Sequence, residues 1–153
     1  MRIIFVFLSL LLFVCCNTNT ESSYSVFEED SWHADSIITL NHSVVDTITK
    51  QNLYLKIRHT TDFEYQNIFL FVDFQDKRDT IEVILSEKNG KWLGSGFGDV
   101  KDVEFCLAKE VIFNSKKASK VTVEQAMRYG EQPVITNLKG IIALGINIKK
   151  SED

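Results

Sequence analysis

The feature that most constrains the fold of this chain is an alternation of apolar and polar residues, which recurs from Tyr24 onwards. The run Leu53 to Arg58 reads Leu-Tyr-Leu-Lys-Ile-Arg, and Thr80–Ser86 and Lys120–Gln125 alternate in the same way. A period of two places neighbouring side chains on opposite faces of a strand, so each run predicts a β-strand with one apolar face. No stretch keeps a helical period over three turns.

Other segments fit the same fold. Ile68 to Val72 and Ile141 to Ile148 are apolar on both faces, as is typical of central strands. Shorter strands are expected at 24–28, 36–41 and 105–113. About eight short strands separated by turn residues predict an all-β chain that forms an antiparallel β-sandwich. A closed β-barrel is the second choice.

One hairpin has a predicted register. Asn89-Gly90 lies between two lysines, and Asn-Gly is the pair that best accepts the two positive φ angles of a type I′ turn. This turn would place Ile81, Val83 and Leu85 opposite Gly98, Gly96 and Gly94, respectively. A departure from pairing after Leu93 is an equal alternative, because glycines within a strand often mark irregular pairing.

The N-terminus is typical of an export signal that ends in a pair of cysteines. Met1-Arg2 precedes an apolar run from Ile3 to Val14, and Cys15 and Cys16 follow. The run is too short to span a bilayer, which takes about 20 apolar residues. A positive start, a short apolar stretch and a cysteine at the cleavage point indicate a bacterial lipoprotein signal. We favour Cys16 as the lipid attachment residue, because the small Cys15 would then precede the cut; Cys15 is the alternative.

This interpretation divides the chain of 153 residues into three parts. Residues 1–15 are the predicted signal peptide, 16–23 a lipidated tether and 24–153 one β-sandwich domain. A flexible segment of this length spans roughly 15 Å, so the domain should lie close to the membrane. We expect a membrane facing the periplasm, and the outer membrane rather than the inner one.

Composition excludes some classes of function. The net charge of −4 gives no basic patch, so a nucleic-acid partner is not expected. After removal of the leader and lipidation, only Cys106 is left as a free cysteine, which argues against disulfide bonds. It lies in an apolar stretch and is expected to be a small core residue.

Five segments, taken in order, carry a family resemblance. They are Asn52–Phe74, Asp79–Leu85, Gly90–Asp99, the Met127-Arg128 pair and Gly140–Lys150. Together with the leader they resemble the gliding-motility lipoprotein GldH family of Bacteroidota. The resemblance implies a non-enzymatic accessory of the gliding and type IX secretion machinery, with partners among its envelope proteins. It implies no catalytic residue and no cofactor.

Patterns for catalysis or metal binding are weak. The three histidines are scattered: His33, His42 and His59. No nucleophile and base accompany them, so surface roles are expected and no metal site is predicted. The carboxylates in 73–79 have basic residues among them, which favours a soluble hairpin loop over a calcium site. The glycines of 94–98 open onto no helix, so a glycine row in a sheet is favoured over a phosphate-binding loop.

The best candidate for a partner-binding surface is the connection that follows the strand at 53–58. Arginine and aromatic residues are enriched in protein interfaces. The candidates on the connection are Arg58, His59, Tyr65 and Asn67, and Trp92 and Arg128 complete the set. The alternative is that the residues of the connection tie it together by side-chain hydrogen bonds.

A second class of function is also open. β-Sandwiches host carbohydrate binding through exposed aromatic side chains, and a carbohydrate-binding envelope lipoprotein is the alternative to the accessory role. The aromatic candidates for it are Trp32, Tyr54, Trp92 and Tyr129.

Overall fold

The structure is a computed structural model that describes residues 23–42, 46–113 and 119–151. No helix in these ranges is long and apolar enough to cross a bilayer. The elements are β1 (Ser23–Val26), the 3₁₀ turn η2 (Glu28–Asp30), β2 (Ser31–His33), β3 (Ile38–His42), β4 (Gln51–Thr60), β5 (Asn67–Phe74), β6 (Lys77–Ile84), β7 (Val100–Val111), β8 (Ser119–Gln125), β9 (Asn137–Lys139) and β10 (Ile141–Lys150). The predicted signal peptide, Cys16 and nearly all of the tether lie outside the described residues.

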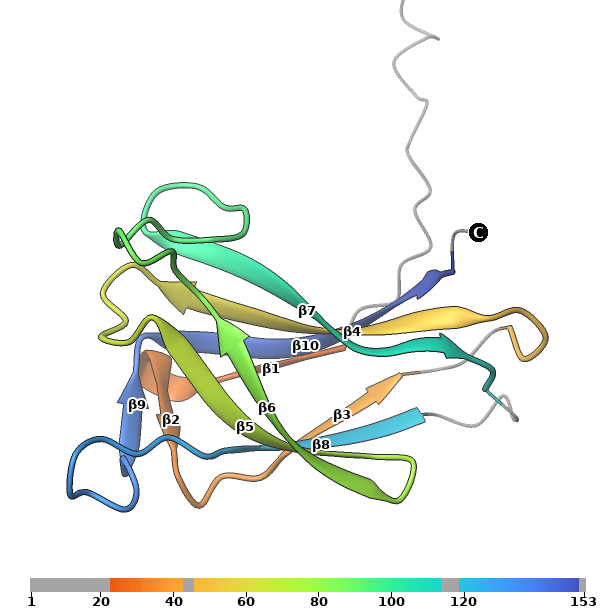
Figure 1. Cartoon of the computed structure of the whole chain (residues 1–153), viewed down its shortest axis with the longest axis horizontal. Helices are drawn as coiled ribbons and strands as arrows, with labels where there is room; N and C mark the ends of the chain where they lie inside the picture. The colour runs from red at the N-terminus through yellow and green to blue at the C-terminus, as the bar shows by residue number, and fades with distance from the viewer. Residues whose placement is uncertain (1–22, 43–45, 114–118, 152–153) are drawn as a thin grey trace, which may run out of the picture.

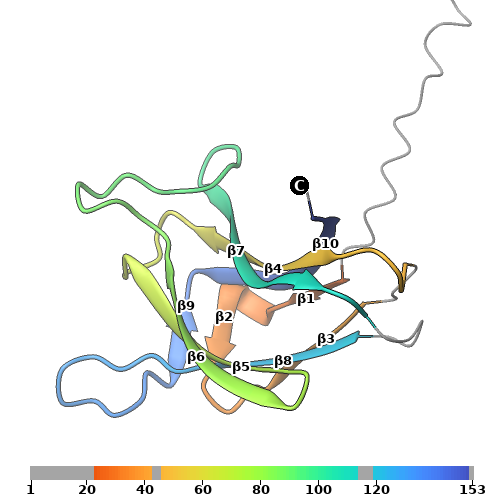
Figure 2. The ribbon, with the colours of Figure 1, turned by 45° about the vertical axis from the view of Figure 1, so that its right-hand side comes forward.

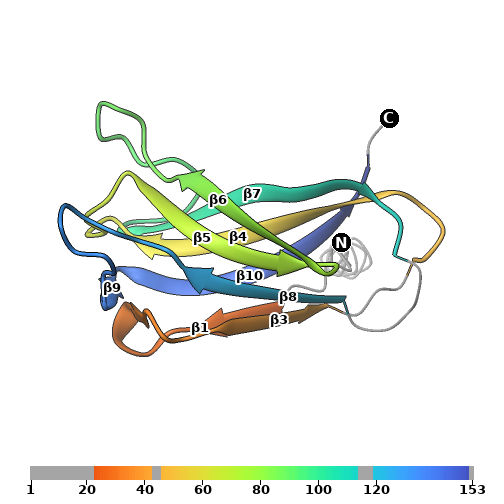
Figure 3. The ribbon, with the colours of Figure 1, turned by 60° about the horizontal axis from the view of Figure 1, so that its bottom comes forward.

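The strands form two four-stranded sheets that face each other (Figure 1). The first sheet has the order β1-β10-β4-β7 and the second the order β3-β8-β5-β6, and neighbouring strands are antiparallel. β1 runs alongside β3 on one side, whereas β6 and β7 are the edge strands on the other (Figure 3). The short pair β2 and β9 lies at one end (Figure 2). The predicted antiparallel β-sandwich is confirmed, with two three-residue strands that were not predicted.

The core follows from the alternation. In β4, Leu53, Leu55 and Ile57 point inward and are fully buried, whereas Tyr54 and Lys56 point outward. Each fully buried leucine or isoleucine contributes roughly 1.5–3 kcal/mol through the hydrophobic effect. Trp32 of β2 and Leu138 of β9 extend this core to the end of the sandwich.

The two strands predicted to be central differ on their outer faces. β10 lies between β1 and β4 and is buried on both faces from Ala143 to Asn147, partly because the Tyr24 ring lies over Gly145. A Cβ added at Gly145 would come within 2.6 Å of that ring. β5 also lies between two strands, but Phe69 on its outer face is 38% exposed. β5 is therefore a central strand with apolar residues on both faces, as predicted, but its outer face is only partly covered.

The predicted register of the Asn89-Gly90 hairpin is wrong. Glu87 N donates to Lys91 O over 2.8 Å, which leaves a loop of three residues, Lys88 to Gly90. Only Gly90 has a positive φ there, at 85°, and Asn89 Oδ1 instead accepts from Lys91 N. This is the pattern of a type I turn that ends in a left-handed glycine. Two consecutive positive φ angles, as in a type I′ turn, occur at Gln75 and Asp76, between β5 and β6.

The glycines after this hairpin pack against β7 and do not face β6. Ser95 pairs with Asp102, and a Cβ at Gly94 or Gly96 would come within 2.1 Å of a β7 carbonyl oxygen. The predicted glycine row in a sheet is therefore wrong, and the alternative of a departure after Leu93 is confirmed. The segment instead forms a projecting loop between β6 and β7 (Figure 2). Phe97 in this loop is 97% exposed.

Candidate functional site

The residues predicted to bind a partner lie in three places and do not form one surface. Arg58 lies on the outer face of the first sheet. His59, Tyr65 and Trp92 lie at the end of the sandwich, where β4 ends and β5 begins. Asn67 and Arg128 lie on the side of the second sheet.

The end of the sandwich holds a chain of aromatic contacts that runs from the core to the surface. The His59 ring lies 4.9 Å from Trp92 and 6.0 Å from Phe63, measured between ring centroids. Phe63 contacts Tyr65 edge-on at 5.5 Å, and Tyr65 lies 6.1 Å from Tyr129. Exposure rises along this chain, from fully buried His59 to Tyr129, which is 68% exposed.

The structure places His59 in the interior. Its Nδ1 lies 2.9 Å from the Thr60 carbonyl oxygen, whereas its buried Nε2 has no hydrogen-bond partner. A neutral ring that donates from Nδ1 fits both facts. Burial lowers the pKa of His59 more than the Thr60 carbonyl raises it. The side chain therefore supports the aromatic chain from inside and does not reach a partner.

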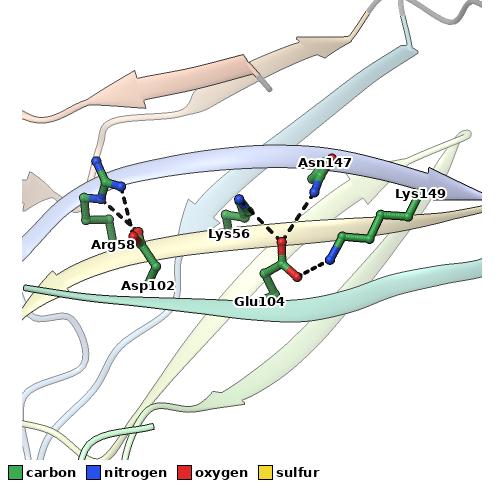
Figure 4. A network of polar contacts seen from close by, with 6 residues as sticks. All are labelled: Lys56, Arg58, Asp102, Glu104, Asn147 and Lys149. Carbon is green, nitrogen blue, oxygen red and sulfur yellow. Dashed lines mark hydrogen bonds and ion pairs between the residues drawn. The ribbon is translucent and has the colours of Figure 1, made fainter. Parts of the chain in front are cut away.

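The outer face of the first sheet is closed by charge pairing (Figure 4). Arg58 binds Asp102 in a bidentate pair, with Nε to Oδ1 at 2.8 Å and an Nη2 hydrogen bond to Oδ2 at 2.9 Å. Glu104 accepts from Lys149 at 2.5 Å and from Asn147 at 3.4 Å. Partial burial acts to raise the pKa of Glu104, but these hydrogen bonds and the positive charges of Lys149 and Lys56 together hold the pKa below its usual value. Arg58 is thus engaged within the molecule.

The outer face of the second sheet is more open. Arg78 is paired with both Asp73 and Glu124, at 2.8 and 2.9 Å. Asn67 donates to Glu82 over 2.5 Å, so it too has an internal partner. Beside them lies a shallow depression of about 400 Å³, lined by Phe69, Phe71, Thr80, Ala126 and Arg128. We call it the Arg128 depression.

Sequence reasoning missed Phe69, Phe71 and Phe97. The first two lie in an apolar run that resembles a fully buried strand, and its residues give no signal that one face is left open. Phe97 lies among glycines that were interpreted as part of a sheet. The sequence Gly96-Phe97-Gly98 could have suggested an exposed loop, because glycine readily takes the positive φ that both glycines have in the structure.

The described residues contain no cluster of three or more His, Cys, Asp or Glu side chains that could hold a metal ion. His33 is exposed on β2, as expected, whereas His42 is buried on β3, so the expected surface role is wrong for His42, as it is for His59. Cys106 is half-buried opposite Tyr54 on the outer side of the first sheet, and not in the core as predicted.

Comparison with known proteins decides the family. The family model described as GldH lipoprotein matches residues 19–148. The chain belongs to the GldH lipoprotein family. The resemblance seen in the sequence is therefore confirmed, and the family name implies a lipoprotein with a membrane anchor in the cell envelope.

Two relatives extend this GldH match over nearly the whole chain. The gliding motility lipoprotein GldH homolog of Christiangramia forsetii is 33% identical and the alignment covers 98% of this chain and 95% of the relative. The gliding motility lipoprotein GldH of Flavobacterium johnsoniae is 30% identical, with 94% and 92% covered. No solved structure matches the chain.

Proposed function

We propose that this chain is a periplasmic lipoprotein that acts through protein contacts. Lipid at Cys16 anchors it, in the outer membrane rather than the inner one. It is a non-enzymatic accessory of the gliding-motility and type IX secretion machinery. Membership of the GldH family and the names of both relatives support the link to gliding. A lipid anchor with more than one acyl chain binds membranes stably.

The observation that carries the proposed mode of action is the direction of the domain relative to its anchor. β1 begins at Ser23, opposite Ile146, and runs to Val26, opposite Ala143. It therefore points from the tether toward the end of the sandwich that holds the aromatic chain. Phe97 and Tyr129 are exposed at this far end. Exposed aromatic side chains on a tethered domain, turned away from the anchor, suit capture of a protein partner.

The alternative of carbohydrate binding receives less support. Trp32 is fully buried, and the Trp92 ring packs against His59. The Tyr54 ring is covered by the Lys149 ammonium at 4.8 Å. Trp32 is therefore closed to a sugar, and Trp92 and Tyr54 each already have a neighbour on the ring against which a sugar would stack.

Photo-crosslinking in living cells tests the proposal. A photoreactive phenylalanine analogue replaces Phe97 at the far end, and a matched analogue replaces Ile48, which is 85% exposed before β4 at the opposite end. We expect crosslinks to envelope proteins of the gliding and secretion complex from position 97 and few from position 48. Equal yields from both positions, or adducts with glycans alone, would contradict the proposal.

A further inference from the structure

The Arg128 depression combines apolar rings with a cation that lacks a partner. Phe69 is 38% exposed and Phe71 is partly buried, and both line the depression from β5. Ile84, 49% exposed, lies on the same face at the end of β6. Apolar side chains that cluster on an outer sheet face mark an interaction site more often than single exposed ones do.

Arg128 differs from the other arginines of the described chain. Arg58 is paired with Asp102, and Arg78 with two carboxylates, over the Phe71 ring at 4.9 Å. Within the described residues, no hydrogen bond, ion pair or ring contact engages Arg128, which is exposed at the rim of the depression. Its guanidinium is therefore free to bind a carboxylate in the bidentate geometry that arginine favours.

We infer that the Arg128 depression binds a protein segment that presents a carboxylate next to an apolar side chain. Arg128 pairs with the carboxylate, and Phe69 and Phe71 contact the apolar group. This inference rests on the proposed function and names the chemistry of the partner.

Size and charge favour this occupant over a membrane surface. A volume of about 400 Å³ accommodates a few side chains of a partner. Binding to anionic lipid takes clusters of several basic residues. Here a single free arginine stands on a chain whose net charge is −4.

Selection from a displayed library of random linear peptides tests the inference, with the full-length chain in detergent as the target. Enriched peptides are then synthesised with each acidic residue kept or replaced by its amide. Their affinities are measured for the wild type and two variants. Arg128→Gln removes the free cation, and Lys120→Gln removes one positive charge from the exposed far end of β8.

We expect enriched peptides to carry Asp or Glu next to an aromatic or aliphatic residue. Both Arg128→Gln and the amide replacement should weaken binding about tenfold or more, as loss of a charged hydrogen-bonded pair does. Lys120→Gln should leave the affinity within about twofold. Arg128→Lys should bind with intermediate affinity, because it keeps the charge and loses the planar pair of donors.

Three results would overturn the inference: selected peptides without an acidic residue, equal losses in the Arg128 and Lys120 variants, or no peptide binding at all. Unchanged melting temperatures of the variants exclude misfolding as the cause. Crosslinking from Phe97 reports on envelope partners independently of Arg128. Crosslinks to envelope proteins combined with a failed peptide selection therefore reject only the inference. Peptide binding through Arg128 without crosslinks from position 97 rejects the proposed function.

Discussion

The outer faces of the two sheets are built from similar strands, but the first is covered by its own side chains and the second is left partly open. On the first sheet, the Tyr24 ring covers Gly145. Arg58 is paired with Asp102 of β7, and Glu104 of β7 is paired with Lys149 of β10. On the second sheet, Phe69 is open to solvent and Arg128 has no partner in the described chain. Alternation along a strand decides which side chains point outward, but the pairing of neighbouring strands decides whether they are covered.

Among the variants that test this comparison, Gly145→Val on the covered face should cause the largest loss of stability. The added Cβ would lie 2.6 Å from the Tyr24 ring and 2.9 Å from the Ser23 carbonyl oxygen, so β1 must shift. Overpacking of this kind typically costs about 1–3 kcal/mol. Urea unfolding of the variant should show this loss. Combination with Tyr24→Ala should recover part of it, and a full loss in the double variant would show that the ring is not the obstacle.

Acid should destabilise the end of the sandwich through His59. Burial keeps the pKa of His59 below its usual 6.5, so the unfolded chain binds the proton more readily than the folded one. Stability is then fully present above pH 6.5 and decreases as the pH falls through the folded pKa. At pH 5.5 the loss is at most about 1.4 kcal/mol. Urea unfolding between pH 7.5 and 5.5 measures it, and His59→Leu should remove this part of the pH dependence. A wild-type stability that is flat over this range would contradict the burial argument.

Arg58→Gln should lower the stability of the domain by a smaller amount. It leaves Asp102, at 27% exposure, without its bidentate partner on the covered face. Partly exposed pairs contribute up to about 1 kcal/mol, and less at high salt. Thermal unfolding at low and high salt measures the change. If the variant matched the wild type at low salt, pairing on this face would not contribute to stability.

The smallest effect on stability is expected for Arg128→Gln on the open face. An exposed side chain without a partner should change the free energy of unfolding by no more than about 0.5 kcal/mol. The same denaturation experiment, run beside the Arg58 variant, checks the contrast between the faces. A loss as large as that of Arg58→Gln would mean that Arg128 has a structural role.

Much of the fold was predictable because it depends on local patterns. The alternation in Leu53 to Arg58 and the apolar run at 141–148 identified β4 and β10 correctly. β2 and β9 were missed because three residues are too few to show a period. The type I′ turn was expected at Asn89-Gly90 and lies at Gln75-Asp76, because the pairing of β5 with β6 imposes the turn on less favourable residues.

The candidate site was less predictable, because it depends on contacts between distant segments. Whether Arg58 is free depends on Asp102, which lies 44 residues away in sequence. Arg128 was predicted to be a partner-binding candidate, but its phenylalanine and threonine neighbours in the depression come from β5 and β6. Only the register of three strands brings these residues together.

The pairing of β1 with β10 has a mechanical consequence. Load transmitted through an N-terminal lipid anchor would reach the domain at Ser23 and pull along the axis of β1. The hydrogen bonds of an antiparallel pair lie perpendicular to the strands, so a pull along the axis loads them in shear, all at once. The neighbouring strand β10 is itself held by β4. Because the Tyr24 ring lies over Gly145, a sliding β1 must also drag this ring across β10. A four-residue strand placed in this way can hold a load that would open it one bond at a time if the pull came from the side.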